Sequence, residues 1–275
     1  MERFDQLMYW IVERHNIFLR KEAGETPPWT NDPELNNYRY CNPYRENDKV
    51  TRWIFTNWLY PHRNHKDLWF AMVIARLLNN PNSLQELGYP TEWNEEYFIH
   101  RLNSIKKTQK IFNAAYIVST NGVSMDKVEY LAKRALGPLW AAREYIRPRE
   151  DDTLLTFFSR LNKYDGMGSF MSGQVIADVK HGQMKDAEDW WTFAVPGPGS
   201  LRGMRRLHGL DADDKSEDKH WQDSLWHLRD AVNDSTPDDF PEFDAQNIQN
   251  TLCEFDKFMR LKLGEGKPKQ KYLAR

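Results

Sequence analysis

Apolar residues recur at helical spacing along most of this chain. In the first stretch, Phe4 to Leu19, they fall mostly three or four positions apart, which lines one face of an α-helix. The same pattern predicts further helices over residues 43–59, 68–78, 97–118, 125–145, 153–161, 170–179 and 244–263. The sequence has no convincing run of alternating β-branched residues, so we expect an all-α fold.

Turn-forming residues divide these helices. Gly264 is expected to end the last helix. Residues 211–241 are acidic and punctuated by prolines, which predicts a surface insertion with a short helix near residues 220–232. The expected organisation is one helical domain over residues 1–275, with a hairpin core at about 150–210, this acidic insertion and a basic tail at 267–275.

The composition limits which partners and which cell compartment the protein can be expected to have. The formal net charge is -2 at pH 7, so DNA binding would need a local basic face. The 11 Trp, 12 Tyr and 14 Phe residues are many for a mean hydropathy of -0.79, which predicts that some rings form stacking surfaces outside the core. The two cysteines fit no disulfide or metal spacing, and no segment resembles a signal peptide or a membrane span. We therefore expect an intracellular protein without a membrane partner.

Two observations on the sequence argue against kinase chemistry and against a zinc site. The chain has no G-x-x-x-x-G-K-[ST] phosphate-binding loop, which disfavours nucleotide-driven kinase chemistry. His62 and His65 have no third ligand nearby in the sequence, so a zinc site is not expected.

The segment from Asn42 to Arg52 contains the first candidate site. On a continuous helix Arg45, Asp48 and Arg52 would share one stripe. Such a stripe is most often a solvated face with an ion pair. The functional alternative is an arginine pair, held by Asp48, that binds an anion such as phosphate.

A Gly-x-Gly turn at Gly166 and Gly168 lies between two amphipathic helices. This layout is that of a helix-hairpin-helix, in which the glycines allow close approach to a DNA phosphate. Ser169 then begins a helix whose free N–H groups favour an anion. The alternative is a tight corner between two packed helices.

Three aspartates follow the hairpin, at Asp178, Asp186 and Asp189, and Trp190-Trp191 stands directly after them. A carboxylate beside two tryptophans would be partly desolvated, which suits a general base. The structural alternative is an aspartate that caps the N-terminus of the segment that follows it.

A glycine-rich segment then leads into a cluster of arginines. A serine can cap the helix that starts here, and three guanidiniums near a helix N-terminus suit a diphosphate. The residues concerned are Gly197, Gly199, Ser200, Arg202, Arg205 and Arg206.

These blocks occur in one order with two more near the C-terminus, Leu252 to Lys257 and Gly264 to Pro268. The series resembles the α-glutamyl/putrescinyl thymine pyrophosphorylases, which are phage amino acid:DNA transferases. It is also similar to the helical domain of 5-hydroxymethyluracil DNA kinases. The resemblance extends from about Tyr38 to Tyr272.

The resemblance implies a fold like that of helix-hairpin-helix DNA glycosylases. It also implies a reaction in which an amine, an amino acid or putrescine, displaces pyrophosphate from 5-(pyrophosphoryloxymethyl)uracil in DNA. One of the three aspartates would be the base, and Asn42, the hairpin and the two tryptophans would contact DNA or the base. Pyrophosphate would be bound by the glycine loop before Arg202, together with Arg45, Arg52, Arg202, Arg205 and Arg206. Phe170 stands where lyase-type glycosylases place a lysine, so strand cleavage through a Schiff base is disfavoured.

The expected partners are double-stranded DNA carrying modified uracil and a small amine donor, in the cytoplasm of a phage-infected bacterium. No cofactor is required by the sequence, although Mg²⁺ could bridge pyrophosphate and an aspartate. Two alternatives stay open: a glycosylase that excises a modified base, and a non-catalytic DNA-binding module that partners a DNA kinase.

Overall fold

The computed structural model of the protein describes residues 3–113 and 119–266, and within these ranges it contains helices and no β-strand. The all-α prediction is therefore confirmed. The single domain expected from the sequence is built as two compact units. Unit 1 combines the chain up to Asp48 with the chain from Ala194 onward, and unit 2 runs from Lys49 to Phe193. Each unit buries its own hydrophobic core.

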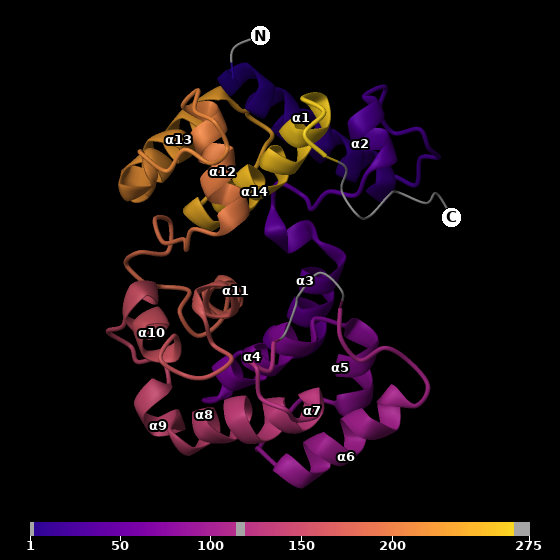
Figure 1. Ribbon diagram of the computed structural model, residues 1–275, viewed down its shortest axis with the longest axis vertical. Helices are drawn as coiled ribbons and strands as arrows, with labels where there is room; N and C mark the ends of the chain where they lie inside the picture. The colour runs from indigo at the N-terminus through magenta and orange to yellow at the C-terminus, as the bar shows by residue number, and fades with distance from the viewer. Residues whose placement is uncertain (1–2, 114–118, 267–275) are drawn as a thin grey trace. The chain divides into compact units, whose positions relative to one another are not determined.

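Unit 1 is organised around its last helix. Its α-helices are α1 (Arg3–Glu22), α2 (Pro33–Asn37), α12 (Pro198–Leu207), α13 (Trp221–Ser235) and α14 (Ala245–Lys262). α12 packs along α14, and α1 and α13 also contact both of these helices (Figure 1). Trp10, Phe243 and Phe255 are at most 1% exposed in this core. α13 lies in the segment expected as a surface insertion, but it buries Trp221 and Leu225, so that segment also contributes to the core.

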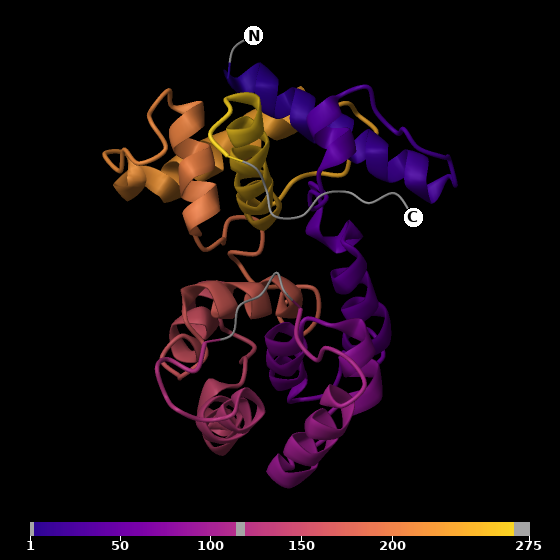
Figure 2. The same ribbon diagram turned by 45° about the vertical axis from the view of Figure 1, so that its right-hand side comes forward.

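Unit 2 is built around one buried helix. Its α-helices are α3 (Lys49–Ile54), α4 (Leu68–Leu78), α5 (Pro81–Leu87), α6 (Glu95–Lys106), α7 (Lys127–Tyr130), α8 (Gly137–Ala141), α9 (Arg143–Ile146), α10 (Leu154–Leu161) and α11 (Ser169–Val179). Every residue of α4 is buried, because this helix is apolar on nearly all sides. α4 packs against α11, and α11 also contacts α10 (Figure 2).

The structure corrects some predicted boundaries. The helix expected over 43–59 is interrupted: a 3₁₀ turn covers Arg45–Asn47, Asp48 is extended, and α3 continues into a π-helical stretch, Phe55–Leu59. The helix expected over 97–118 ends at Lys106. Residues 114–118 and the tail 267–275 lie outside the described residues. None of the described helices has the length and apolar character needed to cross a membrane.

Candidate functional site

The Gly-x-Gly turn lies in unit 2, between α10 and α11, and this helix–turn–helix segment is called the hairpin below. Its assignment as a DNA-binding helix-hairpin-helix stays a prediction. Gly166 has a φ of +79°, and a Cβ there would come 2.9 Å from the Ala135 Cβ, so glycine is required at this turn. Gly168 precedes α11, where a Cβ would meet open space. Gly168, Ser169 and Phe170 are exposed, and no side chain caps α11. The start of α11 therefore presents backbone N–H groups at an accessible surface.

Asp178 lies inside unit 2 and is 0% exposed. Its carboxylate accepts two hydrogen bonds from Arg76, from Nε at 2.6 Å and from Nη2 at 2.5 Å. The same guanidinium donates to Thr51 Oγ1 and Asn79 Oδ1. This geometry makes Asp178 the counter-ion of a buried arginine and keeps its oxygens away from any bound substrate.

The two other aspartates lie in different surroundings. Asp186 has a side chain that is 82% exposed and pairs with Lys185 at 2.6 Å. Asp189 accepts hydrogen bonds from the backbone N–H groups of Leu154, at 2.7 Å, and Leu155, at 3.0 Å. Asp189 therefore caps a helix, as the structural alternative proposed, but the helix is the preceding α10. The cap also holds the carboxylate in one fixed position.

The tryptophan pair is anchored by a buried lysine. Lys180 Nζ donates to the Trp190 carbonyl at 2.8 Å and lies 3.7 Å from the centroid of the Trp190 ring. Trp190 Nε1 donates in return to the Lys180 carbonyl at 2.8 Å. The Trp191 ring packs against that of Trp190 at 4.7 Å and is 45% exposed. Trp191 is thus a fixed, partly exposed aromatic surface two residues beyond Asp189.

In unit 1 the glycines of the predicted diphosphate loop have a packing role. Gly199 and Gly203 belong to α12, which lies against α14. A Cβ on Gly199 would come 2.5 Å from Cys253 Sγ, and a Cβ on Gly203 would overlap the carbonyl oxygen of Leu252. These glycines are explained by the close approach of two helices, which the sequence analysis did not consider.

Side chains of unit 1 itself form hydrogen bonds at the N-terminus of α12. Gly197 N–H donates to Ser200 Oγ at 3.0 Å, and Gln249 Nε2 approaches the same oxygen at 3.3 Å. Ser200 is 0% exposed. The predicted cap is therefore shifted: Gly197 is the N-cap of α12, and Ser200 lies within the first turn, where its hydroxyl binds the Gly197 backbone and is not available at the surface.

The three arginines of α12 are bound by carboxylates. Arg202 and Arg206 each donate to Asp256 at 2.9 Å, and Asp256 is 0% exposed. Arg205 makes two hydrogen bonds to Asp218, at 2.8 and 2.5 Å. Of the three, Arg202 has a side chain that is 34% exposed, against 7–8% for the others. An incoming diphosphate would reach Arg202 most easily.

The segment Asn42–Asp48 folds onto α14. The backbone N–H and the side-chain amide of Asn42 both donate to Asp48 Oδ1, at 2.8 and 3.1 Å. Asn250 donates to the Asn42 carbonyl at 2.9 Å, and Asn247 accepts from the Arg45 N–H at 2.9 Å. Burial raises the pKa of Asp48 to about 6. Arg45 and Arg52 do not share a helical stripe, because the chain is extended at Asp48 and Arg52 lies in α3 of unit 2.

Residues far apart in the sequence thus meet on α14. Cys41 N–H donates to Glu254 Oε2 at 3.0 Å, and Gly199 lies against Cys253. The blocks near residues 41–48, 197–203 and 252–257 form one polar junction in unit 1, which also includes Asn247 and Asn250. Sequence reasoning missed these two asparagines, although their spacing of three on a helix was a usable signal.

Residues 1–268 match the protein family described as the helical domain of 5-hmdU DNA kinases. The chain belongs to this family. It is 25% identical to a 5-hmdU DNA kinase of Bacillus phage SP10, in a match that covers 72% of this chain and 35% of the relative. The chain therefore corresponds to about a third of the length of that curated relative. No solved structure matches it at a significant level.

Family membership covers both units of this helical domain, so the hairpin and the polar junction belong to one matched segment. Within residues 3–113 and 119–266 no three His, Cys, Asp or Glu side chains are grouped in a way that could hold a metal ion. A role for Mg²⁺ stays a prediction.

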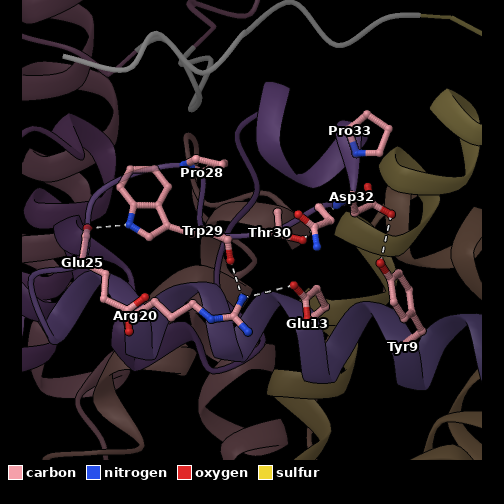
Figure 3. A pocket seen from close by; sticks show the side chains of 10 residues that line it. Tyr9, Glu13, Arg20, Glu25, Pro28, Trp29, Thr30, Asp32 and Pro33 are labelled. Carbon is pink, nitrogen blue, oxygen red and sulfur yellow. Dashed lines mark hydrogen bonds and ion pairs between the residues drawn. The ribbon is translucent and has the colours of Figure 1, made fainter.

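Unit 1 of this helical domain also contains a polar cavity of about 690 Å³ between α1 and the loop that follows it (Figure 3). Arg20 Nη1 lies 3.3 Å from Glu13 Oε1 and donates to the Trp29 carbonyl. Tyr9 Oη donates to Asp32 Oδ2 at 3.2 Å. The lining thus contains two separate polar pairs, Arg20 with Glu13 and Tyr9 with Asp32. None of these four residues was a candidate from the sequence.

Proposed function

We propose that this chain acts on bases derived from 5-hydroxymethyluracil in phage DNA, within a hypermodification pathway. The observation that carries the proposal is the family match over residues 1–268, supported by the similarity to a phage 5-hmdU DNA kinase. The proposed partner is double-stranded DNA carrying the modified uracil. Such DNA places the reaction in the cytoplasm of the infected bacterium.

The proposed reaction is the exchange of pyrophosphate for an amine. The amine nitrogen forms a bond to the methylene carbon on C5 of uracil, and the C–O bond to pyrophosphate breaks. Pyrophosphate leaves with the bonding electron pair, and the nitrogen loses a proton to a carboxylate. The site must therefore supply a base and stabilise the departing anion.

Asp189 is the proposed base. A base must touch the reacting nitrogen, and Asp178 is sealed in its ion pair with Arg76. Asp186 projects into solvent, where nothing fixes a substrate beside it. The two N–H donors of α10 hold the carboxylate of Asp189, and each of its oxygens keeps a second lone pair for a proton. Trp191, two residues further on, is the proposed stacking surface for an extruded base.

Anion binding is assigned to two separate elements. The exposed start of α11, at Gly168 and Ser169, is proposed to contact a DNA phosphate through its N–H groups. In unit 1 taken by itself, Arg202 is the α12 arginine that an anion could reach most easily, because its side chain is the most exposed of the three. All three arginines are paired with carboxylates, so any of them would exchange a carboxylate contact for a phosphate.

The test uses the purified chain with DNA that carries 5-(pyrophosphoryloxymethyl)uracil, together with a panel of amino acids and diamines. The DNA is then digested to nucleosides and analysed by mass spectrometry. We expect one amine to give a substituted thymidine and release pyrophosphate. Unchanged nucleosides with every amine would refute the transferase, and release of a free base would instead identify a glycosylase.

A second candidate function is a DNA-binding module that serves a kinase. It is favoured by the relative, of which this chain matches only 35% and which is named as a kinase, and by the internal pairing of the α12 arginines. This module would bind DNA with 5-hydroxymethyluracil and leave every nucleoside unchanged. Gel-shift titrations measure DNA binding, which both functions predict. The mass analysis separates the two functions, because only the transferase changes the nucleosides.

A further inference from the structure

The connection between α5 and α6 in unit 2 forms a cavity of about 350 Å³ with aromatic walls. The cavity shares no lining residue with the hairpin or with the polar junction. Its lining residues are Ile74, Leu87, Gly88, Tyr89, Pro90, Thr91, Glu92, Trp93, Asn94, Tyr97 and Phe98. Both its volume and its mixture of apolar walls with few polar groups are typical of a small-molecule site.

Three rings of this cavity are held in place by their neighbours. Tyr89 stacks on His62 with ring centroids 3.6 Å apart and planes within 15°. Trp93 packs against two buried phenylalanine rings of the core. Tyr97 Oη donates to the Leu87 carbonyl at 3.1 Å, which fixes a ring that is otherwise 52% exposed.

The backbone around the cavity is equally constrained. Gly88 ends α5 with a φ of +77°, a conformation that favours glycine. Asn94 caps α6 by accepting the Tyr97 N–H at 2.8 Å. The loop between these residues therefore holds the rings in position before any ligand binds, and less conformational entropy is lost on binding.

Glu92 is the one charged side chain among the lining residues, all of which the structure describes. The cavity therefore disfavours anions such as phosphate and favours a positive charge. His62 lies behind Tyr89, and burial, with the neighbouring His65, lowers its pKa below the ordinary value. His62 is thus neutral near pH 7 and does not repel a cation. Aromatic faces beside a carboxylate attract an ammonium group through the quadrupole of each ring.

We propose that this cavity binds a small primary alkylammonium ion, with its charge beside Glu92 and against the faces of Trp93 and Tyr97. This site rests on the proposed function and deepens it, because it gives the amine donor a place to bind. Binding is measured on the protein without DNA, so its outcome is independent of the transfer assay.

The first experiment is isothermal titration of the full chain at pH 7.5 with butylamine and 1,4-diaminobutane. Butyrate and uridine serve as an anion and a neutral planar ring of comparable size. We expect both amines to bind and the other two compounds not to bind. Equal binding of butyrate, or tighter binding of uridine, would overturn the proposal. Tighter binding of N-acetyl-lysine methylamide than of the free amines would overturn it too, by indicating a protein side chain as the ligand.

Variants then locate the site. Glu92→Gln and Tyr97→Leu should each weaken amine binding about fivefold, the effect of losing one exposed cation–π or ionic contact of about 1 kcal/mol. Both side chains are exposed, so the fold should tolerate the changes. The matched control is Glu96→Gln, an exposed carboxylate of α6 that does not line this cavity. An equal loss in the control would mean general charge attraction and would refute the site.

Discussion

Arg76 and Asp178 form a two-point ion pair in the interior of unit 2, with N–O distances of 2.6 and 2.5 Å. The pair joins α4 to α11, the helix that follows the hairpin. Both residues are at most 1% exposed. The position of the hairpin therefore depends on a contact between residues that are 102 positions apart in the sequence.

Asp178→Ala should destabilise the fold by about 3–5 kcal/mol, because it leaves the Arg76 guanidinium buried without its counter-ion. Urea unfolding followed by circular dichroism measures the loss. Asp186→Ala is the control, since its exposed side chain should contribute within about 0.5 kcal/mol. A stability change below 1 kcal/mol in Asp178→Ala would contradict the buried ion pair.

Asp189 has a structural and a proposed chemical role, and two substitutions separate them. Asp189→Ala should cost about 1 kcal/mol through loss of the α10 cap and should also abolish transfer. Asp189→Asn can accept from only one of the two N–H groups of Leu154 and Leu155, so we expect it to lose less stability than Asp189→Ala. We expect no transfer, because an amide cannot take the proton. Thermal unfolding and nucleoside analysis are measured on the same preparations. Full transfer by Asp189→Asn would remove Asp189 as the base, and Asp186→Asn should behave as the unmodified protein.

Two glycine substitutions distinguish a glycine needed for helix packing, Gly203, from one proposed to contact DNA, Gly168. Gly203→Ala should destabilise the fold by about 1–3 kcal/mol, because its Cβ overlaps the Leu252 carbonyl and α12 must move away from α14. Gly168→Ala meets open space, so we expect a cost within about 1 kcal/mol. It should nevertheless weaken DNA binding in a gel shift if the start of α11 contacts phosphate. Unchanged DNA affinity in Gly168→Ala would count against the hairpin as a DNA contact.

The raised pKa of Asp48 predicts a pH dependence of stability. Burial favours the protonated carboxyl in the folded state, with a pKa of about 6 against an ordinary value of 3.8. Its contribution to stability is therefore fully present below about pH 4 and is lost as the pH rises through 6. Asp48→Asn cannot ionise, so its stability relative to the unmodified protein should increase between pH 4 and pH 6 or 7. Urea titrations at each pH measure this difference, and a constant difference would show that Asp48 has an ordinary pKa.

Periodicity along the chain was sufficient to predict the fold class and several elements. The helices expected over residues 4–19, 68–78, 153–161 and 244–263 are present with boundaries within a few residues. A helix forms from contacts between residues three or four apart, so its signal is local and can be read directly. The left-handed turn at Gly166 was predictable for the same reason, since its backbone conformation is local, but the close contact with Ala135 that also requires glycine there was not.

Partners that are distant in the sequence could be identified only from the folded chain. The pattern of polar residues is the same whether an aspartate binds a buried arginine, as Asp178 does with Arg76 and Asp256 does with Arg206, or points into solvent, as Asp186 does. Likewise a glycine before arginines predicts an anion loop, but Gly199 and Gly203 exist because α14 passes close to them. Burial and charge pairing arise when segments about 50 to 100 residues apart come into contact, and no local pattern encodes which segments these are.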